Sequence, residues 1–167
     1  MADRPGQGGA ESHSGSRSQA VPERAAAVLG ELGEEADDGE QAAMRRVLAG
    51  YLRALAGDRW GRACSALADE PRRQLTALGK RAKRRGVLSE DAGCPQILGG
   101  VQAEVPAELR QRMARANLTG GWVRGGHGFI AFEPDGESVG FFPMTRKGDD
   151  WRVGAIAASN LPPAPRG

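Results

Sequence analysis

Apolar positions recur with a helical period along the first two-thirds of the chain. The clearest stripe has the spacing i, +3, +4, +7, +8 and +11, which places all of its members on one face of a helix. Its members are Met44, Val47, Leu48, Tyr51, Leu52 and Leu55. Weaker stripes of the same kind predict further helices over 22–34, 60–67, 71–85 and 89–101, and one beginning at 106. The front of the chain is therefore predicted to be helical.

The apolar period changes to two near residue 117, which is typical of strands. The alternation covers 117–124, 127–133, 138–146 and 150–158. Short turns rich in Gly, Pro and Asp separate these segments, so the strands are predicted to pair as an antiparallel meander. Because Pro143 has no backbone N–H, its strand is predicted to lie at an edge or to be bulged there.

Helices followed by a meander predict an α+β fold, in which N-terminal helices pack on a roughly four-stranded antiparallel sheet. We expect this domain over 41–160, after a short helix and an acidic link over 21–40. Residues 1–20 are rich in Gly, Ser and charge. Burial cannot offset their ordering entropy, so a disordered tail or linker is expected there. Residues 161–167 are a Pro-rich tail.

Alternation also places aromatic side chains on both faces of the predicted sheet. Phe129 and Phe132 point to opposite faces, as do Phe141 and Phe142. One face is expected to pack on the helices. The other is expected to meet a partner, because an exposed apolar face usually marks an interface.

Composition narrows the class of protein. The 167 residues are 40% hydrophobic and 26% charged, a globular balance. No apolar run approaches the roughly 20 residues of a membrane span. Two Cys and two His are too few for a zinc finger or a disulfide-dense miniprotein, and we expect neither a metal nor a cofactor. His127 follows a glycine pair at a turn and is expected to be structural.

The net charge of +2 conceals a segregated pattern. Residues 1–43 carry a charge of −6, residues 44–86 carry +9 and residues 87–167 carry −1. A basic patch on the helix predicted over 71–85 comprises Arg72, Arg73, Lys80, Arg81, Lys83, Arg84 and Arg85. It could meet an anionic lipid, nucleic acid or cell-wall polymer. We favour a solvated helix face, which the acidic segment 31–40 would neutralise. Nucleic acid is the least expected partner, because no aromatic stacking residue lies in the run.

Residues 1–20 lack the apolar segment of a signal peptide. Two interpretations stay open. The segment is either the start of a cytosolic protein, or a linker that follows an upstream signal or anchor.

Several segments resemble NTF2-like domains. Residues 47–58 resemble the opening helix of that superfamily, and 63–67 resemble an A-C-x-x-L motif found in small actinobacterial exported proteins and lipoproteins. Cys94, residues 105–110 and residues 148–153 are also similar to that group, whose last strand reads G-x-W-x-V.

The resemblance covers about 41–158 and implies a curved sheet that wraps around helices to form a cone with a pocket. Members of the group are mostly non-enzymatic or uncharacterised, and many lie beside a membrane anchor. The resemblance therefore implies an extracytoplasmic or membrane-tethered module that binds a small apolar ligand or an envelope protein. It also implies a homodimer that forms through the sheet face. We expect Tyr51, Trp60, Trp122 and Phe129 to line the pocket. No strand pattern occurs in 58–101, so the cone is expected to be small or open.

Cys64 and Cys94 are expected to form a disulfide, mainly because of this resemblance. The alternative is two buried free thiols in a cytosolic protein. In that case the chain would be a cytosolic partner-binding protein with a basic helix face, and the redox state of the two cysteines separates the interpretations.

An enzyme of the ketosteroid isomerase or cyclase kind is the other alternative. Its chemistry needs a carboxylate in an apolar pocket and a donor for the oxyanion. Only Glu133 and Tyr51 have suitable side chains. We give less weight to this role, because Glu133 adjoins a turn and Tyr51 lies on the apolar stripe.

Overall fold

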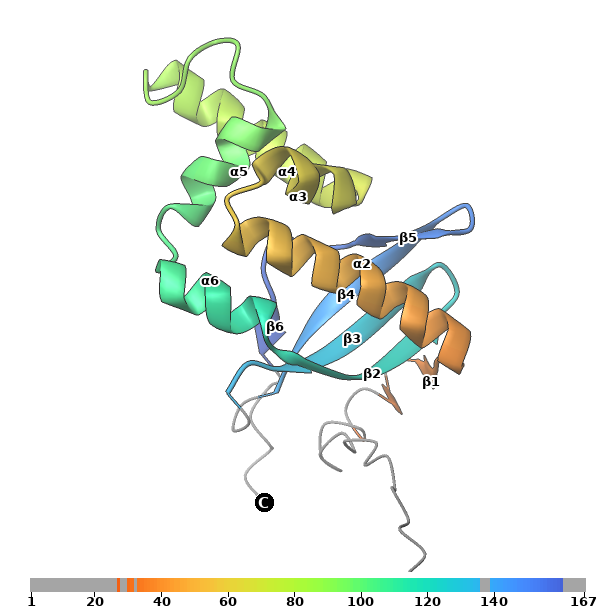
Figure 1. Ribbon diagram of the computed structural model, residues 1–167. Helices are drawn as coiled ribbons and strands as arrows, with labels where there is room; N and C mark the ends of the chain where they lie inside the picture. Colours follow the sequence, from red (N-terminus) through yellow and green to blue (C-terminus); the bar gives the residue numbers. More distant parts are fainter. Residues whose placement is uncertain (1–26, 28–29, 32, 136–138, 161–167) are drawn as a thin grey trace, which may run out of the picture.

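The chain folds into five helices and a six-stranded antiparallel sheet within the residues that the computed structural model describes, which are 27, 30–31, 33–135 and 139–160 (Figure 1). The helices are α2 (Asp38–Ala56), α3 (Trp60–Ala66), α4 (Asp69–Arg84), α5 (Cys94–Gln102) and α6 (Ala107–Ala114). The strands are β1 (Glu34–Glu35), β2 (Asn117–Arg124), β3 (His127–Glu133), β4 (Gly140–Lys147), β5 (Asp150–Val153) and β6 (Ser159–Asn160). The predicted α+β class is confirmed.

The sheet runs in the order β1-β2-β3-β4-β5, and β6 pairs with β4 beside β5. The prediction of roughly four strands missed two short ones. The strand expected over 150–158 ends at Val153 as β5, and β6 follows it at 159–160; the two pair with different stretches of β4. Strand β1 lies where the helix over 22–34 was expected to end, and most of that predicted helix lies outside the described residues.

Strand β1 consists of two glutamates, whose polar side chains give no strand signal. Glu34 pairs with Val123, and Glu35 pairs with Trp122. A Cβ on the preceding Gly33 would lie 2.6 Å from the carbonyl oxygen of Val123. Glycine therefore lets the backbone approach the edge of β2 closely enough to add this strand.

Pro143 lies inside the sheet rather than at an edge, so that part of the prediction was wrong. Its carbonyl accepts a hydrogen bond from the Gly154 N–H at 2.7 Å. Strand β4 pairs with β5 from Met144 onward and with β6 up to Phe141. The missing N–H of Pro143 thus falls where β4 changes partners, and little ladder hydrogen bonding is lost.

Helix α2 builds the core against the inner face of the sheet. Asp37 caps it by accepting a hydrogen bond from the Glu40 N–H at 2.8 Å. The predicted stripe is buried, except for Val47, which is partly buried. It packs with inner-face residues of β3, β4 and β5, among them Ile130, Phe142 and Val153.

The outer face of the sheet carries a second, smaller apolar cluster. Trp122 and Ala131 are buried in it, and Phe129 and Phe141 pack beside them, with ring centroids 5.8 Å apart. Phe132 and Phe142 belong to the inner core instead. The predicted division of the aromatic residues between two faces is confirmed.

Helices α4 and α5 pack on each other beyond α3, away from β2 and β3 (Figure 1). Helix α4 begins at Asp69, before the expected Pro71. Helix α5 begins at Cys94 rather than at 89, with a proline in its first turn. Within the described residues, no helix is long and apolar enough to cross a bilayer.

Candidate functional site

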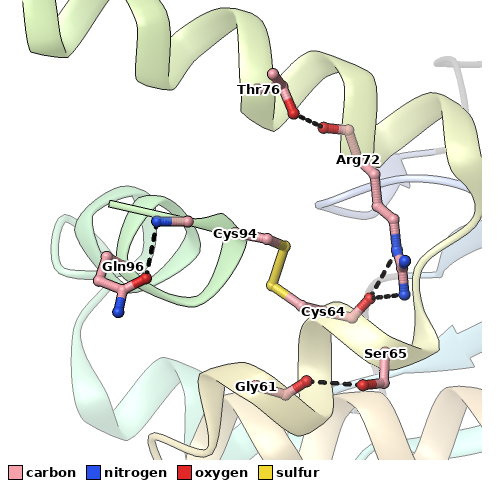
Figure 2. The surroundings of a disulfide bond; sticks show 8 residues. Gly61, Cys64, Ser65, Arg72, Thr76, Cys94 and Gln96 are labelled. Carbon is pink, nitrogen blue, oxygen red and sulfur yellow. Dashed lines mark hydrogen bonds between the residues drawn. A yellow bond between two sulfur atoms is a disulfide. The ribbon is translucent and has the colours of Figure 1, made fainter. Parts of the chain in front are cut away.

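A disulfide joins Cys64 in the last turn of α3 to Cys94, the first residue of α5 (Figure 2). The two Cα atoms are 6.2 Å apart, and 30 positions separate the residues in sequence. The expected pairing is confirmed. The bond holds α5, and with it α4, against α3.

Two arginines bind backbone carbonyl groups in the last turn of α3. Nε and Nη2 of Arg72 donate to the Cys64 carbonyl at 3.0 and 2.8 Å (Figure 2). Nη1 of Arg152, from β5, donates to the Ser65 carbonyl at 2.7 Å. Carbonyls in the last helical turn lack partners within the helix and attract cations. Arg72, a member of the predicted basic patch, therefore also has a structural role.

The rest of the basic patch lies along one helix and is partly neutralised. Arg73 forms an ion pair with Glu70, and Lys83 donates to the Glu90 carbonyl. Lys80, Arg81, Arg84 and Arg85 are exposed on α4 or directly after it. In the acidic segment 31–40, Glu40 forms its ion pair with Arg146 of β4 and not with α4.

Five other arginines surround an open groove between α2, α3 and β5, with a volume of about 400 Å³. Arg46 and Arg53 come from α2, and Arg62 comes from α3. Arg59 directly precedes α3, and Arg152 comes from β5. Val47, Gly50, Tyr51, Ser65, Ala66 and Trp151 complete the lining. No Asp or Glu is among these lining residues. We call this surface the arginine groove.

Gly50 keeps the arginine groove open on the α2 side. It lies between Arg46 and Arg53 along the helix, and an added Cβ would meet no atom within 4 Å. A glycine inside a helix costs roughly 0.5–1 kcal/mol relative to alanine. The chain nevertheless has glycine at this position, where a larger side chain would occupy the groove.

Most of the groove arginines keep their hydrogen-bonding capacity. Arg152 uses one nitrogen on the Ser65 carbonyl, and Nη2 of Arg59 reaches the Arg53 carbonyl at 3.4 Å. Arg46, Arg53 and Arg62 have exposed side chains and no ion pair with any described residue. A guanidinium stays charged at all ordinary pH values and binds carboxylate or phosphate through two parallel hydrogen bonds. The exposed guanidinium groups are therefore available to bind an anion.

The structure does not bring together the four residues of the expected apolar pocket. Tyr51 is buried on the inner side of the sheet, whereas Trp122 and Phe129 belong to the outer cluster. Trp60 lies on α3, with the Arg110 guanidinium 5.7 Å from its ring centroid. Only Tyr51 of the four contributes to the arginine groove.

A small apolar cavity lies on the inner side of the sheet. It has a volume of about 60 Å³ and lies between the C-terminal half of α2, α6 and the segment after β5. Sites for drug-sized molecules usually measure roughly 300–1,000 Å³. A third hollow, of about 440 Å³, adjoins β1 and the turn after β2, and Glu31, Glu34 and Arg124 give it mixed charge.

Tyr51 and Glu133 do not form a catalytic pair. The Tyr51 hydroxyl donates to the Ile156 carbonyl at 2.8 Å, and burial raises the pKa of this hydroxyl far above its ordinary value. Glu133 ends β3 in the alternation that carries Phe129 and Ala131 to the outer face. His127 begins the same strand and is exposed. No cluster of three potential metal ligands occurs in the described part of the chain.

The residues of the arginine groove are the ones that sequence reasoning missed. Arg46 and Arg53 belong to the polar side of the predicted α2 helix and give no motif. The signal that could have found them is the charge of +9 over 44–86, only part of which lies on α4. Comparison with protein-family models, with curated proteins and with solved structures finds no match. The assignment of this site therefore depends on its own geometry.

Proposed function

We propose that this domain is a non-catalytic binding module and that the arginine groove is the surface on which it holds an acidic partner. One observation carries the proposal. Five arginines, from α2, from β5 and from 59–62 at the start of α3, line one hollow that has no Asp or Glu among its lining residues.

Electrostatics favours an anion at this position. Like charges that gather around a concave, partly apolar surface raise the local potential, and an anion that enters relieves their repulsion. Val47 and Trp151 contribute apolar area to the lining, which lowers the local dielectric. Each charge-assisted hydrogen bond formed there contributes about 1.5–3 kcal/mol if it is shielded from water.

The compartment that we propose is the cell envelope. The Cys64–Cys94 disulfide supports an oxidising environment, and the resemblance to exported NTF2-like proteins points the same way. If thiol titration of protein from its native cell found both cysteines free, that result would favour the cytosolic alternative.

An acidic envelope partner fits the geometry better than a small apolar ligand. The apolar cavity of about 60 Å³ has room for roughly two water molecules. The isomerase alternative loses its support because Tyr51 and Glu133 are not brought together. We also propose a sheet-face homodimer, because Trp122 and Phe129 belong to an apolar cluster on the outer face of the sheet. Light scattering at micromolar concentration tests for this dimer.

Titration calorimetry with tripolyphosphate, a compact polyanion, tests the groove. We compare Arg46→Glu/Arg53→Glu with Arg84→Glu/Arg85→Glu at physiological ionic strength. Both pairs change the net charge equally, but only the first lies in the arginine groove. We expect the first pair to weaken binding about a hundredfold. The second pair should change it by less than about threefold, because charges beyond the Debye length are screened.

Either of two results would refute the proposal. Equal losses in the two variants would show that net charge alone attracts the ligand. Failure of the wild-type protein to bind tripolyphosphate would show that the groove is not an anion site.

A further inference from the structure

We infer that the acidic partner of the arginine groove is a second copy of this chain, which brings the glutamates at its β1 edge to the groove. This inference rests on the proposed function and names the partner. The glutamates are Glu31, shortly before β1, and Glu34 and Glu35, which form β1. We call these three residues the acidic edge.

The acidic edge is accessible and lacks cationic partners. All three glutamates are exposed, and none of them forms an ion pair with a described residue. Strand β1 is the last strand on its side of the sheet, so no other described strand covers its outward edge. Arg124 adjoins Glu31 and Glu34 in the hollow beside β1. One arginine among three glutamates leaves an excess of negative charge that a second molecule can meet.

The acidic edge and the arginine groove lie at opposite ends of the sheet (Figure 1). The strand order begins at β1 and ends at β5, and the groove adjoins β5. Four strand spacings separate β1 from β5, or about 19 Å along the sheet. Charges are screened beyond a Debye length of about 8 Å at physiological ionic strength. The two surfaces of one copy therefore cannot neutralise each other, whereas those of two copies can.

The ion pairs within one copy agree with this separation. Glu40, farther along the same acidic segment, pairs with Arg146 of β4, which is not among the residues that line the groove. Among the described residues, no ion pair joins the acidic edge to a groove arginine. The segregation of charge in the sequence, −6 over 1–43 and +9 over 44–86, is thus retained in the fold as two unpaired surfaces.

The chemistry of the two surfaces is complementary. Arg46, Arg53 and Arg62 are exposed and have no ion pair with a described residue. A guanidinium binds a carboxylate through two parallel hydrogen bonds. Glu34 and Glu35 are adjacent, so one short segment supplies two carboxylates. Each copy would use one surface toward one neighbour and the other surface toward the next, which is a head-to-tail contact that forms rings or filaments.

Sedimentation velocity tests this inference. We expect the wild-type protein to self-associate in about 50 mM sodium chloride, and this association should weaken at least tenfold in about 500 mM, because salt screens exposed ion pairs. Tripolyphosphate should also dissociate the copies, since it competes for the groove. The variants Glu34→Gln/Glu35→Gln and Arg46→Gln/Arg53→Gln should each associate at least about tenfold more weakly than the wild type.

Each of these variants has a control with the same net charge. The control for the edge variant is Glu90→Gln/Asp91→Asn, which changes two exposed acidic residues after α4. The control for the groove variant is Arg84→Gln/Arg85→Gln, which changes two exposed arginines at the end of α4. Both controls should associate within about threefold of the wild type, because they lie outside the contact.

A mixture of the edge variant and the groove variant tests the contact itself. The edge variant keeps an intact groove, and the groove variant keeps an intact acidic edge, so one contact can form between them. We expect this mixture to recover the wild-type contact affinity within about threefold, although each variant alone associates weakly.

Three results would overturn the inference. A wild-type protein without salt-dependent association would show that the groove takes a different acidic partner. Association that is unchanged in either variant would place the contact elsewhere, as a sheet-face homodimer would. A mixture that does not associate would show that the groove and the acidic edge do not meet. All three results leave the proposed function standing if tripolyphosphate binds the groove, whereas failure of tripolyphosphate to bind refutes that function as well.

Discussion

The chain carries two groups of basic residues that differ in how the fold arranges them. On α4 they follow one another in sequence and project from a single helix, where Glu70 and the Glu90 carbonyl engage two of them. In the arginine groove they are spread from residue 46 to residue 152 but converge on one hollow. Basic residues that are clustered in sequence can thus remain a solvated surface, whereas dispersed ones can form a site.

The largest expected effect on the free energy of unfolding comes from removing the disulfide that attaches α5, and with it α4, to α3. Replacing Cys64 and Cys94 by serine should lower the free energy of unfolding by about 3–4 kcal/mol, because a loop of 30 residues is no longer closed. Urea denaturation measures this change.

The same double variant tests whether the basic residues on α4 and the arginine groove depend on the disulfide to different extents. Amide hydrogen exchange should increase more in α4 and α5 than in α2, because the disulfide joins α5 to α3. Tripolyphosphate affinity should change by less than about threefold, since contacts with α2 also hold α3. A uniform increase in exchange, or loss of binding, would contradict this division of the molecule.

The packing between α4 and α5 gives the next effect. A Cβ on Gly79 would lie 2.4 Å from Cδ1 of Ile97, so Gly79→Ala should overpack the interface. We expect a loss of about 1–3 kcal/mol in unfolding free energy by urea denaturation. In Gly100→Ala, the added Cβ meets nothing within 4 Å, and this control should be neutral or stabilising. A stabilised Gly79→Ala would show that the Ile97 side chain or α4 shifts at little cost and that this interface is not tightly packed.

Charge inside the groove can be tested at Gly50, where new side chains have room. Gly50→Glu places a carboxylate among the arginines, and Gly50→Gln places an amide of the same size there. We expect Gly50→Glu to bind tripolyphosphate about tenfold more weakly than Gly50→Gln by calorimetry. Equal affinities would mean that charge in the groove does not control binding.

The smallest effect is on stability at the same position. Gly50→Ala should raise the free energy of unfolding by roughly 0.5–1 kcal/mol, because alanine is the better helix former and has open space here. Thermal denaturation checks the direction. A loss of stability would show that the α2 backbone at Gly50 needs glycine for its conformation.

The sequence was sufficient for the elements whose side chains carry a repeating signal. The stripe from Met44 to Leu55 and the alternation after residue 117 both correspond to elements of the expected type. Strand β1 escaped prediction because Glu34 and Glu35 are polar. It forms because the edge of β2 offers unpaired hydrogen-bonding groups, which is a tertiary effect.

The candidate site could not be predicted in the same way. Arg46 and Arg53 lie on the polar side of the stripe from Met44 to Leu55, and each of them is exposed. They line one groove with Arg62 and Arg152 because of how α2, α3 and β5 pack. The apolar periodicity of the sequence does not predict that packing. The disulfide was expected mainly through the resemblance to exported proteins, and the pairing proved correct.

A residue-resolved titration of the isotope-labelled protein with tripolyphosphate tests the central claim most directly. The account predicts that backbone amide shifts concentrate along Arg46–Arg53 of α2, over Arg59–Ser65 and at Arg152 of β5, while Lys80–Arg85 changes little. Shifts that concentrate on Lys80–Arg85 instead, or that spread equally over both basic groups, would contradict it.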